Sequence, residues 1–577
     1  MSKMRALAIS LGMALGITSA FAQFNGPAPL SWRWQQPTTQ SPSGSPAIDG
    51  DVIYVASGQR MYALNRVDGN QKWRYPVASY LEANLKGTPA LGGGLVVAAS
   101  ENRTLYAVDA KTGVKAWSYI SPASIIGSPL ISKNLVLFQM ADGIMAVTLD
   151  KGEPFYKTPI FLKDGIQGSF SIWGDDVLVF SSLHTLYSIN IGSQRVDWQK
   201  DTAGVGLDAY AVPGSDTLYF VSNNYLIGLG AGDGNARFST AVDDNLVLAP
   251  AVSKNYILAM TRDGKAYCFK RNGDRVAGEH GKVVPPIDLK SPPLLRPTAI
   301  EGDKFVVATQ AGTIELIDPT VDPTHAIVWN YPIRPIGGAQ DVKPEAGGGP
   351  GGKGGPGGPG GPGGGFGSGG FGGPPQGGGQ PPQGGGQNPG INRGSPGSGV
   401  TRIVTIQAAG PPILDGSTLL VLGRDGSLLA FDNETGVDLT PPKVTMTYPN
   451  AGDIVSSKPP LALVFKLEDE ASGVNEDTLK VTVDGKDVDF TLNKEGVVIV
   501  RCSNTGKNHL SDGKKRIVID VSDWMGNVAH VQFSLTIDND LPPVQPVQDP
   551  NAPANGKFGG GPGKGGGGGA GGGALGG

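Results

Sequence analysis

Short apolar runs separated by Gly, Pro and Asp make up most of the first 440 residues. The clearest unit spans residues 87–119. It begins at a Thr-Pro turn, continues with apolar runs at 95–99 and 105–109, turns at 111–113, and ends in a run that carries Trp117. Runs of this length bounded by turn residues are typical of antiparallel strands. A repeat of about 40 residues with four strands per unit indicates a propeller blade.

The start of this unit recurs as a short turn tetrapeptide that leads into an apolar run. Seven starts follow one another at intervals of 40 to 48 residues, and the eighth comes after a long Gly- and Pro-rich insert. The starts lie at residues 45–48, 88–91, 128–131, 169–172, 209–212, 249–252, 297–300 and 411–414. Eight units predict an all-β chain with an eight-bladed β-propeller over residues 28–440.

The last strand of each unit is expected to carry an aromatic residue. The sixth unit has none. Units one to five and unit seven have one each, namely Trp73, Trp117, Phe155, Trp198, Phe238 and Trp329. The eighth unit runs into Thr440 and lacks its last strand, whereas a strand-like run at 30–34 precedes the first unit. Pairing this N-terminal run with the eighth unit would close the ring and leave no open sheet edge.

A family resemblance rests on the run 107–117, which reads Ala-Val-Asp-Ala-Lys-Thr-Gly-Val-Lys-Ala-Trp. It resembles the tryptophan-docking repeat of quinoprotein (PQQ-like) propellers. Residues 63–73 match the pattern, and 430–436 match its first half, so the resemblance covers about residues 30–440. In that family the Trp of one blade packs on the backbone near the Gly of the next. The resemblance implies such a structural role for Trp34, Trp73, Gly113, Trp117, Trp198 and Trp329.

The N-terminal residues 1–22 predict a signal peptide. Lys3 and Arg5 precede a short apolar stretch, and the Ala-Phe-Ala motif at 20–22 predicts cleavage between Ala22 and Gln23. The residue directly after this bond is Gln23 and not Cys, and no later stretch is long and apolar enough for a membrane span. We therefore expect an exported protein without a lipid anchor or a transmembrane segment, in the periplasm or at the surface of a bacterium.

Two segments have a composition that cannot build a core. Residues 337–400 and 541–577 are dominated by Gly and Pro, and both are predicted to be disordered. Between them, residues 441–540 contain about seven short strand-like runs without the 40-residue repeat, which indicates a β-sandwich. Its motifs at 469–474 and 523–527 resemble bacterial immunoglobulin-like domains of exported proteins.

Three acidic residues of this second domain are weak calcium candidates: Asp469, Glu470 and Asp477. Carboxylates close together can bind calcium in extracellular β-sandwiches. The alternative is that they are solvated loop acids, one of them a turn cap. No other metal site is predicted, because the five histidines lack ligand spacing.

The resemblance also implies one enzymatic alternative. PQQ-dependent quinoprotein dehydrogenases oxidise alcohols or sugars with pyrroloquinoline quinone and calcium on an eight-bladed propeller. Such a site needs a catalytic Asp, calcium-ligating Glu and Asn and, in the alcohol dehydrogenases, adjacent cysteines. This chain has only Cys268 and Cys502, and no stretch matches those site motifs. The sequence therefore predicts no catalytic residue and no cofactor.

The favoured interpretation is a non-catalytic scaffold that binds protein partners in the cell envelope or at the cell surface. A propeller presents two loop-lined faces on a stiff body. The net charge of −4 argues against nucleic acid as a partner. The chain is also similar to the periplasmic propeller proteins of outer-membrane barrel assembly, from which it differs in lacking a lipid-anchor Cys and in adding a second domain.

Overall fold

The computed structural model describes residues 24–36, 40–206, 208–276, 283–335, 405–493 and 495–544. The predicted signal peptide with its cleavage site at Ala22 and Gln23, the insert at 337–400 and nearly all of the tail lie outside these residues. The regular secondary structure of the described chain is almost entirely β-strand. Its two short 3-10 helices, η2 (Glu301–Asp303) and η3 (Pro323–His325), flank strands of the seventh blade.

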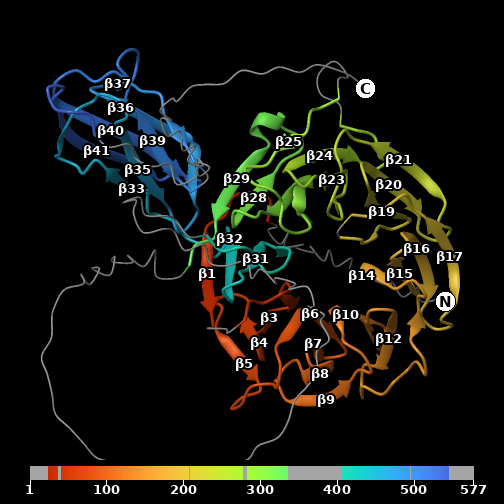
Figure 1. The fold of residues 1–577 in the computed structure, drawn as a ribbon. Helices are drawn as coiled ribbons and strands as arrows, with labels where there is room; N and C mark the ends of the chain where they lie inside the picture. Colours follow the sequence, from red (N-terminus) through yellow and green to blue (C-terminus); the bar gives the residue numbers. More distant parts are fainter. Residues whose placement is uncertain are drawn as a thin grey trace, which may run out of the picture. The chain divides into compact units, whose positions relative to one another are not determined.

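Eight four-stranded antiparallel sheets follow one another around a ring (Figure 1). Blades 1 to 4 comprise β2 (Ala47–Asp49), β3 (Val52–Ser57), β4 (Arg60–Asn65) and β5 (Gln71–Tyr75); β6 (Leu85–Gly92), β7 (Leu95–Ser100), β8 (Thr104–Asp109) and β9 (Lys115–Ile120); β10 (Ile126–Ser132), β11 (Leu135–Gln139), β12 (Gly143–Thr148) and β13 (Ile160–Phe161); and β14 (Ile166–Trp173), β15 (Asp176–Ser181), β16 (Thr185–Asn190) and β17 (Val196–Asp201).

The second half of the ring follows the same order. Blades 5 to 8 comprise β18 (Val212–Pro213), β19 (Thr217–Ser222), β20 (Tyr225–Gly230) and β21 (Ala236–Ala241); β22 (Ala251–Val252), β23 (Tyr256–Met260), β24 (Lys265–Lys270) and β25 (Ile287–Asp288); β26 (Thr298–Ala299), β27 (Phe305–Ala308), β28 (Thr313–Ile317) and β29 (Ile327–Pro332); and β30 (Ile413–Asp415), β31 (Thr418–Leu422), β32 (Ser427–Asp432) and the N-terminal β1 (Leu30–Gln35). This is the eight-bladed propeller that the repeat predicted.

The ring closes through the N-terminal strand, as the incomplete eighth unit predicted. Strand β1 pairs antiparallel with β32, with Arg33 opposite Leu429 and Trp34 opposite Leu428. The eighth blade therefore combines residues nearly 400 positions apart. Because its outer edge is filled by β1, closure depends on the first described segment of the chain.

The apolar core is divided among the interfaces between blades. Each buried cluster joins neighbouring sheets, and together the clusters cover every interface of the ring. The closing interface, for example, packs Trp34 of β1 and Leu420 of β31 against Ile53 and Tyr62 of blade 1. Burial between sheets is the main stabilising term of such a fold, because each blade alone is too thin to bury its own faces.

The turn tetrapeptides that start each unit link the innermost strands by hydrogen bonds. The hydroxyl of Ser45 donates to the carbonyl of Pro411 across the closing interface (2.7 Å), and the N–H of Ser45 donates to the Thr88 hydroxyl (2.9 Å). The N–H of Thr88 in turn donates to the hydroxyl of Ser128 (2.8 Å). In these three units the hydroxyl at this position therefore bonds a backbone group of a neighbouring blade, whereas units five to eight begin with Ala or Pro.

The second domain consists of two sheets around a common core. One sheet has β33 (Lys443–Tyr448), β35 (Ala462–Glu468), β39 (Val497–Arg501) and β38 (Thr491–Leu492); the other has β34 (Ile454–Val455), β41 (Val528–Ile537), β40 (Gly513–Asp523), β36 (Val474–Val483) and β37 (Lys486–Asp487). Side chains of both sheets, such as Phe465 and Ile519, share one buried cluster. The domain is thus a β-sandwich, and its immunoglobulin-like kinship stays a prediction. Cys268 and Cys502 are both free thiols.

Candidate functional site

The turn between the third and fourth strands of blade 2 shows why the docking repeat has its sequence. The Asp109 carboxylate accepts hydrogen bonds from the N–H and the hydroxyl of Thr112, both at 2.8 Å, and these donors hold the pKa of Asp109 below its ordinary value. Gly113 then adopts φ +70°, a conformation that favours glycine. A Cβ at Gly113 would lie 2.6 Å from the Trp73 ring of blade 1, whose indole N–H donates to the Ala110 carbonyl (2.9 Å).

The same contact recurs at two further interfaces. The Trp117 indole donates to the Leu149 carbonyl (2.8 Å), and its ring lies over Gly152. The Trp198 indole donates to the carbonyl of Ala231 (3.1 Å), and its ring lies over Gly234 of blade 5. Four of the predicted docking residues therefore lie at contacts between neighbouring blades: the side chains of Trp73, Trp117 and Trp198 and the backbone of Gly113.

At the closing interface the docking residue is Trp32. The family resemblance had implied Trp34 instead. The Trp32 indole donates to the Arg66 carbonyl (2.9 Å), and its ring lies over Gly69. Trp34 is buried in the core and meets Tyr62 edge-on, with ring centroids 5.0 Å apart. Both tryptophans face blade 1, because residues two apart in a strand share a face. The register decides between them.

That register provides a signal that sequence reasoning missed. Trp32 lies opposite Ala430 of β32, just as Trp73 lies opposite Ala63 and Trp117 opposite Ala107. In each of these blades the alanine precedes the Asp or Asn of the docking turn by two residues. Aligning the N-terminal run with this alanine would have selected Trp32.

Blade 3 uses a different residue from the predicted Phe155. Phe155 is exposed, and the neighbouring Tyr156 is buried, with its hydroxyl donating to the Ile191 carbonyl of blade 4 (2.7 Å). The turn of blade 4 carries Gln194 at the position of the docking glycine, with φ +56°. A side chain there leaves no room for an indole ring on the turn, so a phenol that reaches the carbonyl replaces the Trp.

Trp329 of blade 7 also departs from the expected pattern, because it contacts the second domain and not the turn of blade 8. Its indole N–H donates to the Ser472 carbonyl (3.0 Å). The Tyr331 hydroxyl donates to the Glu470 carbonyl (2.8 Å), and the N–H of Leu30 in β1 donates to the Ala471 carbonyl (2.7 Å). Three propeller groups therefore bind three consecutive carbonyls of residues 469–473, which we call the junction loop.

Three buried carboxylates come together at the junction loop, one of them from the loop itself. Asp438, Asp469 and Asp523 each offer an oxygen, and these oxygens lie within 4.8 Å of one another. Asp469 accepts the N–H groups of Ser472 (2.9 Å) and Gly473 (2.6 Å), and Asp438 accepts the Ser472 hydroxyl (2.6 Å). We call this group the junction carboxylates.

Only one of the predicted calcium candidates belongs to the junction carboxylates. Asp469 is buried there, whereas Glu470 contributes its carbonyl to Tyr331, and Asp477 lies exposed on β36. Clustered carboxylate oxygens are the donors that calcium takes, so the arrangement could hold such an ion, and calcium binding stays a prediction. Spacing alone does not join Asp438 and Asp523 to Asp469, because the three are far apart in the chain.

Burial raises the pKa of Asp469, and the charges of Asp438 and Asp523 raise it further. The N–H groups of Gly473 and Ser472 oppose this shift, but they do not cancel it. The carboxyl of Asp469 therefore holds its proton more tightly in the folded protein than in the unfolded chain.

A charged contact also crosses the centre of the ring. Arg296, before the first strand of blade 7, forms a two-pronged ion pair with Asp208 ahead of blade 5, and it donates to the Ser169 hydroxyl of blade 4 (2.7 Å). Its guanidinium lies 3.8 Å from the Tyr210 ring centroid. Blades 4 and 7 are separated by two blades, so this contact links parts of the ring that are not neighbours.

The two faces of the propeller carry different turns. Strand direction alternates, so the connections between blades share one face with the turns between second and third strands, and we call this the connection face. The opposite docking face carries the docking turns. Several large apolar side chains on the connection face of blades 1 to 4 are exposed to solvent: Val77, Tyr80, Ile120, Ile126, Phe161 and Leu183.

Comparison with known proteins supports the repeat assignment. Residues 31–211 match the PQQ_2 family model, whose description is "Outer membrane protein assembly factor BamB", and this confirms the PQQ-like resemblance over these residues. The outer membrane protein assembly factor BamB of Burkholderia pseudomallei (strain K96243) is 23% identical over 293 aligned residues, which cover 41% of this chain and 76% of that protein.

Two solved structures match part of this chain in a structural comparison. The crystal structure of BamB from Moraxella catarrhalis has a TM-score of 0.47 and 12% identity, and the match covers 70% of this chain and 99% of that chain. A europium-containing methanol dehydrogenase has a TM-score of 0.40 and 13% identity, over 53% of this chain and 80% of that chain. Within the described residues, no helix has the length and apolar character needed to cross a membrane.

Replacing Gly113 by Ala should destabilise the propeller more than replacing Gly94. Both glycines have positive φ, +70° and +76°, so Ala is strained by about 1 kcal/mol at either position. Only at Gly113 does the new Cβ meet the Trp73 ring, whereas nothing lies within 4 Å at Gly94. Overpacking adds about 1–3 kcal/mol. Chemical denaturation of the two variants measures the difference, and equal losses would show that the indole contact contributes nothing.

The stability of the chain should depend on pH through Asp469. Because the folded-state pKa is raised above the ordinary value of 3.8, this group's contribution is full below that value and is lost as pH rises through the raised pKa. Thermal unfolding in EDTA should therefore show a fall in stability with rising pH, up to about 1.4 kcal/mol per pH unit, that Asp469→Asn abolishes. The asparagine oxygen still accepts the loop N–H groups.

Asp477→Asn is the matched control, since it removes an exposed carboxylate of the same domain and should leave the pH dependence unchanged. A pH dependence that is the same in wild type and Asp469→Asn would contradict the assignment. Added Ca²⁺ at neutral pH tests the calcium prediction in the same assay, because an ion held by these carboxylates would raise the wild-type melting temperature only.

Proposed function

We propose that this chain is an exported, non-catalytic scaffold of the bacterial cell envelope that binds protein partners through its connection face. The match of residues 31–211 to a family described as an outer membrane protein assembly factor supports an envelope role of the assembly type. The observation that carries the proposal is the set of exposed apolar side chains on the connection face of four consecutive blades. The docking face of the same blades also has exposed apolar side chains, namely Val67, Val114, Phe155 and Val196, but those of the connection face are more numerous and include Tyr80. Large exposed apolar groups mark interaction surfaces.

The loop between blades 1 and 2 presents its apolar residues in a fixed conformation. Val77 and Tyr80 are 69% and 64% exposed. The buried Arg60 donates two hydrogen bonds to the Ser79 carbonyl (3.2 and 3.0 Å), and its guanidinium lies 3.9 Å from the Tyr80 ring centroid. A partner that covers Tyr80 would therefore meet a preorganised aromatic side chain, which lowers the entropy cost of binding.

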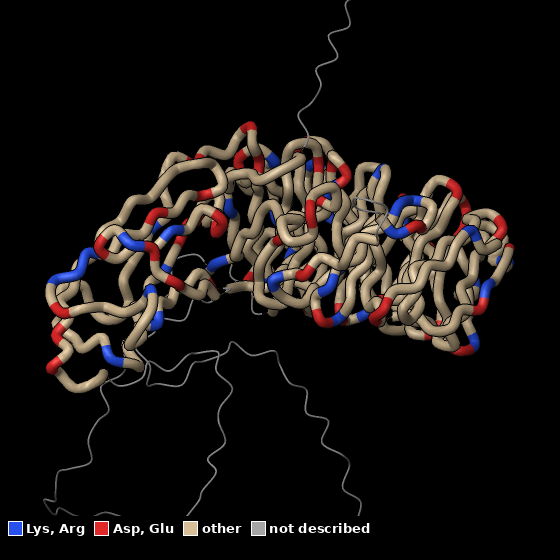
Figure 2. The backbone as a smooth tube through the Cα atoms, turned by 90° about the horizontal axis from the view of Figure 1, so that it is seen from above, with Lys and Arg blue, Asp and Glu red and all other residues tan. Residues whose placement is uncertain are grey.

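The neighbouring loops continue this surface. Ile120 and Ile126 flank the connection from blade 2 to blade 3, Phe161 ends blade 3, and Leu183 occupies a turn of blade 4. Lys and Arg positions are interspersed with Asp and Glu positions over the described backbone (Figure 2), so no single-sign field competes with apolar contact. This distribution favours a folded protein partner over a polyanion.

Exchanging apolar residues on one face and then on the other tests the proposal. The connection-face variant carries Val77→Ser, Tyr80→Ser and Phe161→Ser; the docking-face control carries Val67→Ser, Val114→Ser and Val196→Ser, which are also exposed in wild type. We expect partners captured from solubilised cell envelopes to be retained by the control and reduced at least about tenfold with the connection-face variant. Equal recovery with both folded variants would reject the connection face.

The alternative function, a PQQ-dependent dehydrogenase, makes a different prediction. Pyrroloquinoline quinone would need the centre of the ring, where Arg296 already bonds Asp208 and Ser169. We therefore expect no stoichiometric binding in isothermal titration of the mature protein with quinone and Ca²⁺, and no dye-linked oxidation of alcohols or sugars. Stoichiometric binding with turnover would overturn the scaffold proposal.

A further inference from the structure

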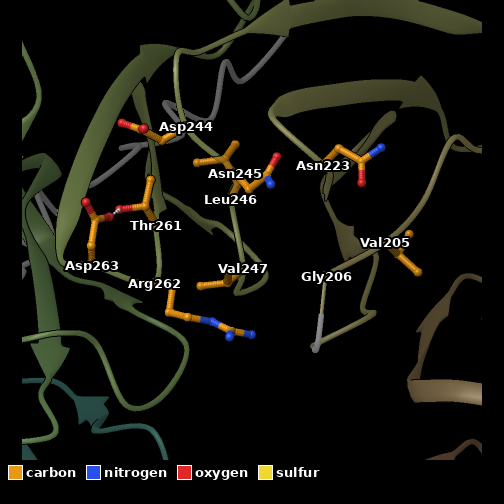
Figure 3. Close-up of a pocket in the computed structure, with 10 residues that line it drawn as sticks. All are labelled: Val205, Gly206, Asn223, Asp244, Asn245, Leu246, Val247, Thr261, Arg262 and Asp263. Atoms are coloured by element: carbon orange, nitrogen blue, oxygen red, sulfur yellow. Dashed lines mark hydrogen bonds between the residues drawn. The ribbon is translucent and has the colours of Figure 1, made fainter. Parts of the chain in front are cut away.

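A pocket of about 650 Å³ lies on the connection face between blades 5 and 6 (Figure 3). Its walls come from the connections that lead into these blades and from their turns between second and third strands. Val205 and Asn223 contribute from the side of blade 5, and Asn245, Val247 and Arg262 contribute from the side of blade 6. None of these residues belongs to the apolar set on blades 1 to 4.

The floor of the pocket is held by backbone contacts. The N–H of Leu246 donates to the Asn223 carbonyl (2.8 Å), and the N–H of Val247 donates to the Met260 carbonyl (3.0 Å). A Cβ placed on Gly206 would lie 2.7 Å from the Val247 carbonyl oxygen, so the two connections touch there and close one end of the pocket. A pocket with such walls is preformed.

The charges in the pocket are unevenly satisfied. Asp244 accepts hydrogen bonds from the Lys265 ammonium (2.8 Å) and the Tyr267 hydroxyl (3.1 Å), and Asp263 accepts one from Thr261. Among the described residues, Arg262 has neither an ion pair nor a hydrogen bond to its guanidinium. Figure 3 shows its side chain toward Gly206 and Val247, away from both carboxylates. The exposed Arg262 therefore brings a positive charge without a described partner to the end of the pocket where the two connections touch.

We propose that this pocket binds the carboxyl terminus of an extended peptide segment of a partner protein. A guanidinium matches a carboxylate with two parallel hydrogen bonds. The amides of Asn223 and Asn245 can pair with a peptide main chain, and Val205 and Val247 provide apolar contact for the side chain next to the end. Because the Gly206–Val247 contact blocks further passage, a chain end fits this position better than a chain that continues.

The proposal rests on the function proposed above and adds a second, independent contact on the same face. Two pools of N-acetylated pentapeptides of random sequence serve as probes, one with free carboxyl termini and one with carboxamide termini. We expect the full mature protein to retain peptides from the free-acid pool only. Arg262→Gln should weaken the selected peptides about tenfold or more, Arg262→Lys should weaken them less, and higher salt should weaken binding to wild type.

Arg103→Gln is the matched control, because Arg103 is an exposed arginine in the equivalent turn of blade 2 and its loss changes the net charge equally. Equal retention of both pools, or equal binding by Arg262→Gln and Arg103→Gln, would overturn the proposal. Retention of carboxamide peptides that contain Asp or Glu would also overturn it and would assign the pocket to acidic side chains. The connection-face variant should keep full peptide binding, so failure of the pocket and failure of the apolar surface are separate results.

Discussion

The ring depends on one contact repeated between neighbours: an aromatic side chain of one blade lies on the backbone turn of the next. The contact has two parts, an N–H or O–H that satisfies a turn carbonyl and a ring that fills the space left by a missing Cβ. Trp73 on Gly113 and Trp117 on Gly152 show both parts. The turn can accept the ring only because its last residue adopts a left-handed conformation, which makes the glycine as necessary as the tryptophan.

Variation around the ring follows the same constraint. In blade 4, Gln194 replaces the docking glycine, and in blade 3 the Tyr156 phenol replaces the indole. The phenol keeps the hydrogen bond to the turn carbonyl but does not pack its ring on the turn. At blade 7 the acceptor itself changes, because Trp329 donates to the junction loop of the second domain. Strand β1 binds the same loop through Leu30. The sandwich is therefore joined to the propeller beside the strand that closes the ring.

The repeat start and the apolar runs predicted the blade number and the closing strand, because both are local patterns with a fixed period. The exact docking partner was harder to predict. Trp32 and Trp34 have the same strand periodicity, and only pairing with Ala430 separates them. Asp438 and Asp523 could not be joined to Asp469 from spacing, since a fold brings them together. The pocket around Arg262 likewise arises from two connections that meet only when blades 5 and 6 are neighbours.

The blade interfaces of the propeller and its junction with the sandwich respond differently to pH and to added cations. Interfaces between blades are built mainly from apolar burial and neutral hydrogen bonds, with a few ion pairs such as Arg296–Asp208 and Arg66–Asp415. Apolar burial and neutral hydrogen bonds change little with pH near neutrality. The junction instead places three carboxylates together, and none of them forms an ion pair within the described residues. Their mutual repulsion opposes the carbonyl contacts made by Trp329, Tyr331 and Leu30. A proton or a cation at the junction carboxylates would remove this repulsion, so the attachment of the sandwich is the part of the structure that such a ligand can strengthen while the ring stays unchanged.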